Sequence, residues 1–171
     1  LRELYFHLYF NAFKPGSEMD VRSSTITDPD PRVGARIAAL TSDEMGDLRC
    51  SDMMQGKRPV QMEYLGTVLR ATLAMPIMPG KRTTLIFNFN GQVPVQIRRS
   101  GRDNAEGVAY SMTQWFPKVA AYDERGWHAD PYVGREFYGE WGDYDVRITL
   151  DSSFTVAATG AWLAATFGTV V

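Results

Sequence analysis

The sequence predicts an all-β domain: an antiparallel β-sandwich or saddle-like arrangement of sheets with a long, ordered, aromatic-rich loop region. Three observations lead to this fold class. Apolar and polar residues alternate with a period of two in several segments, turn dipeptides separate those segments, and helical periodicity is scarce. The 171 residues are 44% hydrophobic, which is enough apolar material for one sizeable core. We expect one domain over residues 1–160, followed by an apolar tail of unclear status at 161–171.

The strands are expected where alternation is clearest. Near the start of the chain, one face carries Leu4, Phe6, Leu8 and Phe10, and the other carries Tyr5, His7 and Tyr9. Further strands are predicted at Thr67–Leu73, Leu85–Phe89, Asp145–Leu150 and Phe154–Ala158. In the third of these, Val146, Ile148 and Leu150 should face a core, while Asp145, Arg147 and Thr149 should face water.

Turn signals punctuate these segments at Lys14–Gly16, Met78–Gly80, Asn90–Gly91 and Ser100–Asp103. Asn90–Gly91 is the dipeptide that suits a type I′ hairpin, so a hairpin is predicted there. The segment Ala35–Met45 can be read either as a short helix or, over its first part, as a strand.

Charge and cysteine content exclude several classes of protein. Eighteen Lys and Arg against 20 Asp and Glu give a net charge of −2, which argues against a dedicated nucleic-acid binder. The single cysteine, Cys50, excludes an internal disulfide framework and is expected to be a structural free thiol. No apolar run is long enough to predict a membrane span. Because the sequence begins at Leu1 without a methionine, we expect a processed chain or a fragment.

Aromatic residues concentrate in the segment Tyr110–Tyr144, which lacks clean alternation and contains several glycines. Its ten aromatic residues are Tyr110, Trp115, Phe116, Tyr122, Trp127, Tyr132, Phe137, Tyr138, Trp141 and Tyr144. Such a segment is expected to be a long loop region held in place by its rings, and ordered long loops are often functional.

No catalytic residue and no metal site are predicted in this chain. It has two histidines, and no His-Glu-x-x-His spacing occurs. His7 is expected on the outward face of the first strand, and His128 is expected to have a structural or hydrogen-bonding role. There is no nucleophile elbow and no glycine-rich phosphate loop.

Acidic residues dominate the segment 118–145, where they favour a solvated acidic rim over a pair of catalytic carboxylates. These residues are Asp123, Glu124, Asp130, Glu136, Glu140, Asp143 and Asp145. The nearby Arg98, Arg99 and Arg102 are expected to pair with this acidic segment or to face solvent.

Several short motifs occur in an order that resembles the first domain of the M1 zinc aminopeptidases. Thr113-Gln114 is followed by an aromatic stretch that ends at Asp123-Glu124, then by Gly142–Leu150 and by Phe154–Gly160. The segments Ser111–Pro117 and Gly126–Tyr132, and the opening Tyr5–Leu8 and Asn11–Phe13, are most similar to a branch of that family in the Bacteroidetes. The Pro and Cys that the family has before this Asp-Glu pair are absent here.

The resemblance implies a non-catalytic β-domain that packs on a zinc-binding catalytic domain of the same polypeptide. It implies that zinc belongs to that other domain, that the parent protein is a zinc aminopeptidase, and that its substrate is the N-terminus of a peptide. Gln114 would help to line the pocket for the substrate's N-terminal residue, with Trp115 and Phe116 turned back to hold the loop. Members of this branch are usually exported, which implies the cell envelope, the periplasm or secretion.

Other functions remain open at this point. A carbohydrate-binding β-sandwich would use Trp115, Trp127 and Trp141 as stacking platforms. A plain interaction domain would pair an apolar patch with a second copy of the chain. Gln114 itself has an alternative role, as a strand-end residue whose amide bonds to the backbone.

Overall fold

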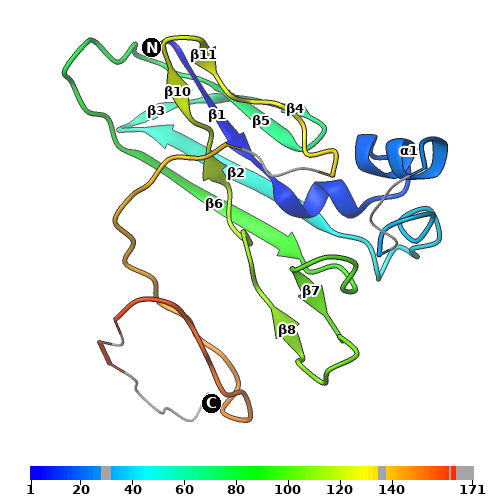
Figure 1. The fold of residues 1–171 in the computed structure, drawn as a ribbon. Coiled ribbons are helices and arrows are strands. Elements are labelled where there is room, and N and C mark those ends of the chain that lie inside the picture. Colours follow the sequence, from blue (N-terminus) through cyan, green and yellow to red (C-terminus); the bar gives the residue numbers. More distant parts are fainter. Residues whose placement is uncertain (28–31, 135–137, 162, 165–171) are drawn as a thin grey trace. The chain divides into compact units, whose positions relative to one another are not determined.

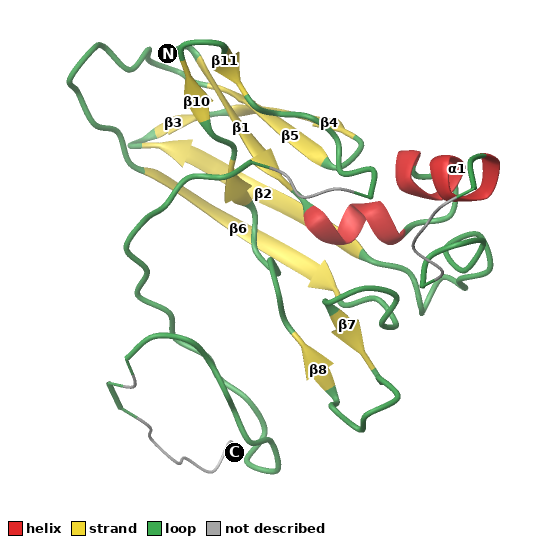
Figure 2. Cartoon of the chain, viewed as in Figure 1, coloured by secondary structure: helices red, strands yellow, loops and turns green. Residues whose placement is uncertain are grey.

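The computed structural model describes residues 1–27, 32–134, 138–161 and 163–164 (Figure 1). The chain divides into two compact units, Leu1–Glu140 and Trp141–Val171. Every helix and strand of the described residues lies in the first unit. Most of these elements are strands (Figure 2), so the prediction of an all-β fold is confirmed.

The elements follow one another along the chain with short connections in most places. In order they are β1 (Glu3–His7), the 3₁₀ helix η1 (Tyr9–Phe13), α1 (Glu18–Thr25), β2 (Asp47–Gln55), β3 (Arg58–Pro59), β4 (Gln61–Leu65), β5 (Val68–Thr72), β6 (Leu85–Gln92), β7 (Gly101–Arg102), β8 (Tyr110–Ser111), β9 (Lys118–Val119), β10 (Tyr122–Asp123) and β11 (Gly126–Trp127).

The strands form antiparallel sheets. The larger sheet has the order β4-β5-β1-β9, and a second sheet has the order β3-β2-β6. Two short pairs, β7-β8 and β10-β11, lie further along the chain. Residues of β1, β5 and β2 contribute to one hydrophobic core, so the two larger sheets are packed around shared side chains.

The core is centred on β1 and the 3₁₀ helix that follows it. Phe6, Leu8 and Phe10 are buried, as their alternation predicts. The strand ends at His7, so Tyr9 and Phe10, which the alternation placed in it, belong to η1 instead. Tyr9 is buried as well, and its ring centroid lies 4.9 Å from that of Tyr132. His7, the last residue of β1, is only 2% exposed, so the prediction of an outward-facing histidine is wrong. Alternation identifies a strand but does not reveal that a later segment covers its second face.

Helix α1 was not predicted, although its N-terminus carries a capping signal. Ser17 accepts a hydrogen bond from the backbone N–H of Asp20, and the Asp20 carboxylate accepts one from Gly16. This reciprocal arrangement satisfies N–H groups that the first turn leaves unpaired. The segment Ala35–Met45 forms turns, and neither of its expected readings, helix or strand, is correct.

The predicted hairpin at Asn90–Gly91 is wrong, because both residues lie inside β6 and pair with Arg49 and Leu48. A side chain at Gly91 would place its Cβ 3.1 Å from Cδ1 of Leu48. This glycine therefore serves a close approach between strands, a use of glycine that competes with turn formation in sequence patterns. The turn predicted at Met78–Gly80 is present, with Gly80 at a φ of 72°.

The strands predicted at Asp145–Leu150 and Phe154–Ala158 are absent from the described residues of the second unit. Val146, Ile148 and Leu150 are each at least half exposed. Alternation creates an apolar face, but a strand also needs a neighbouring strand to satisfy its backbone groups. Most of the apolar tail at 161–171 lies outside the described residues.

A membrane-crossing helix would need a long apolar segment. Among the residues that the structure describes, no helix meets that requirement.

Matched leucine substitutions test which segments are packed. Leu69 in β5 is fully buried, whereas Leu150 is half exposed. Leu69→Ala should lower the free energy of unfolding by about 2–5 kcal/mol, because it leaves a cavity. Leu150→Ala should change that free energy by less than about 0.5 kcal/mol. Equal losses in a urea titration would show that Asp145–Leu150 is packed as a strand.

The burial of His7 predicts an acid-sensitive fold. Burial lowers the pKa of His7 below its ordinary value of 6.5, so the folded chain binds a proton less readily than the unfolded chain. The contribution of neutral His7 to the free energy of unfolding is therefore complete above about pH 6.5. It is lost as the pH falls towards the lower pKa of the folded state. In wild type the loss should reach at most about 1.4 kcal/mol per pH unit, and His7→Gln should lack this component. If the unfolding free energies of wild type and His7→Gln change in parallel from pH 7.5 to pH 5, this prediction is wrong.

Candidate functional site around Gln114

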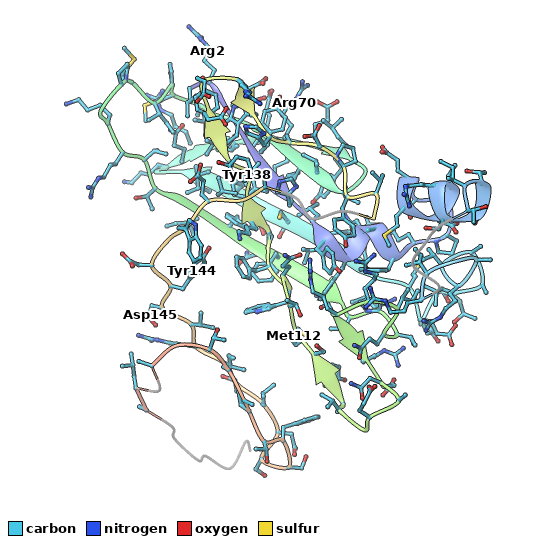
Figure 3. The ribbon with its side chains drawn as sticks, viewed as in Figure 1. Arg2, Arg70, Met112, Tyr138, Tyr144 and Asp145 are labelled. Carbon is cyan, nitrogen blue, oxygen red and sulfur yellow. The ribbon has the colours of Figure 1, made fainter. Side chains whose placement is uncertain are left out.

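Gln114 lies in the segment between β8 and β9, and side-chain hydrogen bonds fix the residues before it. The Ser111 hydroxyl donates to the carbonyl oxygen of Arg99 at 2.6 Å, and the Thr113 hydroxyl donates to the same oxygen at 3.1 Å. The Ser100 hydroxyl donates to the carbonyl of Ser111 at 3.0 Å. Met112, which is labelled in Figure 3, is exposed between the two anchored residues. The backbone that leads to Gln114 is thus attached to the 99–101 segment at several points.

Aromatic packing holds the residues that follow. The Trp115 ring contacts Phe116 at a centroid distance of 5.6 Å and Phe89 of β6 at 5.9 Å. Trp115 also packs against the hydrophobic core. These contacts agree with the expectation that Trp115 and Phe116 turn back to hold the loop.

Gln114 itself has an unusual conformation. Its φ is 55°, in the left-handed region that side chains other than Gly, Asn and Asp seldom adopt. The residue is half-buried, and its amide oxygen Oε1 is shielded from solvent. That oxygen accepts no hydrogen bond within the described part of the chain. The structure therefore holds Gln114 in a strained backbone conformation, and the sequence contains no signal that would reveal it.

His128 has the hydrogen-bonding role that the sequence predicts. Its Nε2 lies 2.7 Å from Oδ2 of Asp123, and its ring meets that of Tyr138 edge to face, with the ring centroids 4.7 Å apart. A hydrogen bond from the backbone N–H of Arg125 and the contact with His128 hold the pKa of Asp123 below its usual range. This pair closes the β10-β11 hairpin and is a structural device.

Two of the three arginines that were expected to pair with the acidic segment or to face solvent make contacts outside that segment. Arg102 forms an ion pair with Asp103 and donates to the carbonyl of Asp43 at 2.7 Å. The guanidinium of Arg99 lies over the ring of Tyr9, 5.7 Å from its centroid. These contacts attach the segment before Gln114 to the core.

A pocket of about 460 Å³ lies where η1, β2 and the β4-β5 turn meet. Its polar side chains, apart from the exposed carboxylate of Glu18, have hydrogen-bond or ion-pair partners within the chain. Lys14 and Arg49 both pair with Asp47, and the Tyr64 hydroxyl exchanges two hydrogen bonds of 2.8 Å with the backbone of Cys50. Burial by itself would raise the pKa of Asp47, but the two cations outweigh it and hold that pKa below its usual range. The pocket walls therefore present no polar group that requires a ligand.

Cys50 is buried beside this pocket, and burial raises the pKa of its thiol to about 11. A thiol that stays protonated at neutral pH is a poor nucleophile, so the expected structural role holds. Within the described ranges, no group of three or more His, Cys, Asp and Glu side chains gathers in a way that could hold a metal ion.

The three tryptophans of the carbohydrate-binding alternative have different surroundings. The Trp127 ring packs between Tyr5 and Tyr122, at centroid distances of 5.6 and 5.0 Å, and Trp115 packs on the core. Trp141 is 99% exposed and belongs to the second unit. These rings do not form one stacking platform on the first unit.

No protein-family model, curated protein or solved structure matches this chain. An all-β fold hosts many unrelated functions, so the fold by itself assigns none. The functional question therefore rests on the segment around Gln114.

A pair of substitutions tests the strain at Gln114. Gln114→Gly removes the Cβ that makes the left-handed conformation costly, whereas Gln114→Ala keeps it. Part of that gain is offset, because glycine has more freedom in the unfolded chain. The glycine variant should be more stable than the alanine variant by about 1 kcal/mol in chemical denaturation. An alanine variant of equal or greater stability would show that the backbone at Gln114 is relaxed.

Proposed function

We propose that this chain is the non-catalytic N-terminal β-domain of an M1-like zinc aminopeptidase. In that role it covers the active-site cleft of a separate catalytic domain and presents Gln114 to the N-terminal residue of a peptide substrate. The observation that carries the proposal is the order of motifs from Thr113-Gln114, through Asp123-Glu124, to Gly142–Leu150 and Phe154–Gly160.

The surroundings of Gln114 support this role. A binding residue must be held in one place, and Gln114 lies between Thr113, which is bonded to Arg99, and Trp115, which packs on the core. Backbone strain of this kind concentrates at functional sites, where the surrounding structure maintains it. The all-β fold is also the fold that the resemblance implies.

The chemistry of an amide suits the recognition of a substrate N-terminus. Once the side chain turns outward, the carboxamide oxygen of Gln114, which is shielded in this chain, can accept a hydrogen bond from an ammonium group, and its nitrogen can donate one to a carbonyl. A neutral residue does both without adding a second charge to the site. In this proposal the zinc ion and the residues that activate water belong to the catalytic domain.

The reading frame beyond Val171 provides the first test. The proposal expects a sequence that encodes a His-Glu-x-x-His helix, whose two histidines would bind zinc on one helix face. The 171-residue chain alone should neither retain stoichiometric zinc nor cleave aminoacyl anilides. A frame that ends soon after Val171, or one zinc bound tightly to the chain alone, would contradict the proposal.

Kinetics of the polypeptide that contains both domains provide the second test. Gln114→Ala should lower kcat/KM by a factor that corresponds to about 1–3 kcal/mol of lost transition-state stabilisation, the scale of one hydrogen bond to a charged group. The loss should be larger for peptides with a free N-terminal amine than for blocked peptides that are cleaved. Kinetics equal to those of the parent enzyme would show that Gln114 has a structural role only.

A further inference from the structure

Strand β6 is an edge strand with an unusual composition. It pairs with β2 on one side, and no other strand of the described residues pairs with it (Figure 1). Its eight residues, Leu85–Gln92, carry no charge, and most of them are exposed. Natural proteins usually protect such an edge with lysine, proline or a covering segment.

The hydrogen bonds of β2 show which backbone groups of β6 face the free edge. The N–H of Leu48 donates to Oδ1 of Asn11 at 2.8 Å, and its carbonyl accepts from Nδ2 of Asn11 at 3.2 Å. The N–H and carbonyl of Cys50 are likewise bonded to the Tyr64 hydroxyl. Leu48 and Cys50 thus direct their backbone groups away from β6.

The partners of these two residues must then direct their own groups the other way. Leu48 is opposite Gly91, and Cys50 is opposite Phe89, so both are non-hydrogen-bonded pairs of the antiparallel ladder. In such a pair, the backbone groups of both residues point outward. Phe89 and Gly91 therefore present an N–H and a carbonyl at the free edge, and Phe87, two residues earlier, does the same.

We propose that this edge pairs with β6 of a second copy, antiparallel and centred on Asn88. The two three-stranded sheets then form one continuous sheet across a two-fold axis. Phe87 of each copy lies opposite Phe89 of the other, and Leu85 lies opposite Gly91. These are hydrogen-bonded pairs, and together they supply about eight backbone hydrogen bonds.

The sequence of β6 is complementary to itself in this register. The facing Phe87 and Phe89 side chains form aromatic cross-strand pairs, which stabilise antiparallel sheets. The two Asn88 residues lie beside the axis on the open face, where each side chain donates to Oδ2 of Asp52 in its own chain at 3.2 Å. On the same face Ile86 is 68% exposed and gains cover from Asn90 of the other copy. Because β6 carries no charged residue, no like charges meet when two copies pair. The other edge strands differ, since β4 carries Glu63 in an ion pair with Arg70, and β9 has only two residues.

The association should be weak, because a single strand pair buries less surface than a standard interface. Native mass spectrometry and light scattering of the whole chain, from about 1 to 500 µM, should show monomer and dimer with a Kd on the order of 10–100 µM. Hydrogen exchange should slow with concentration at the amides of Phe87, Phe89 and Gly91. The amides of Asn88 and Asn90 face β2, so their exchange should depend on concentration much less.

Two variants that each add one negative charge test where the interface lies. Asn88→Asp places two carboxylates about 5 Å apart across the axis and should raise the dimer Kd about tenfold or more at pH 7. It also removes the hydrogen bond of 3.2 Å that the Asn88 amide donates to Asp52 of the same chain, so the control must lose a bond to Asp52 as well. Ser51→Asp adds the same charge on the same face, opposite Asn88 but one strand inward, and it likewise removes a hydrogen bond to Asp52, the one of 3.0 Å that the Ser51 hydroxyl donates. Its two copies lie about 14 Å apart in the dimer, beyond the screening length, so its Kd should change less than about threefold.

Three results would overturn the proposal. One is a chain that stays monomeric over the whole concentration range. Another is a dimer in which the Phe87, Phe89 and Gly91 amides gain no protection, which would place the interface elsewhere. The third is an equal response of the Kd to both variants. The exchange measurement needs only the wild-type chain, so it decides the question even where a variant folds poorly.

Discussion

The buried side chain of Asn11 is the constraint on which the arrangement of the two larger sheets depends. Its amide accepts from the N–H of Leu48 and donates to the carbonyls of Leu48 and Gly66. Asn11 belongs to η1, which continues from β1, so one side chain ties the larger sheet to β2. A buried amide that lost these partners would carry the full cost of unpaired polar groups. No apolar residue of similar shape could satisfy the same backbone.

Several features of the fold follow from this contact. Asn11 and Tyr64 bind the outer edge of β2 at Leu48 and Cys50, so this part of the edge needs no strand partner. Strand β3 pairs with the same edge only at Met54 and Gln55. The same contact determines which residues of β2 direct their backbone groups towards β6. It therefore also determines which residues of β6 direct theirs towards the free edge. The core and the segment around Gln114 are then connected through Trp115, which contacts Phe89 of β6.

The sequence predicted the strands whose alternation is supported by a neighbour, and it failed where a tertiary contact decided the outcome. Alternation over Leu4–Phe10 predicted a strand, but it did not reveal that the strand ends at His7, that Tyr9 begins a 3₁₀ helix, or that His7 is buried. Asn90–Gly91 matched a turn pattern, although Gly91 is needed for close approach to Leu48. The alternation at Asp145–Leu150 has no strand partner in the described residues. Gln114 was selected by resemblance alone, and no pattern in the sequence indicates its left-handed backbone conformation.

Hydrogen exchange at the backbone amide of Leu48 tests the role of Asn11 most directly. The N–H of Leu48 donates its hydrogen bond to the buried side chain of Asn11 and not to a neighbouring strand. Its protection from exchange therefore reports that one contact. If Asn11 joins the two sheets, the Leu48 amide should exchange only through global unfolding, with a free energy equal to that from denaturant titration. Fast exchange at Leu48 while the amides of β1 and β5 stay protected would show that the sheets hold together without Asn11.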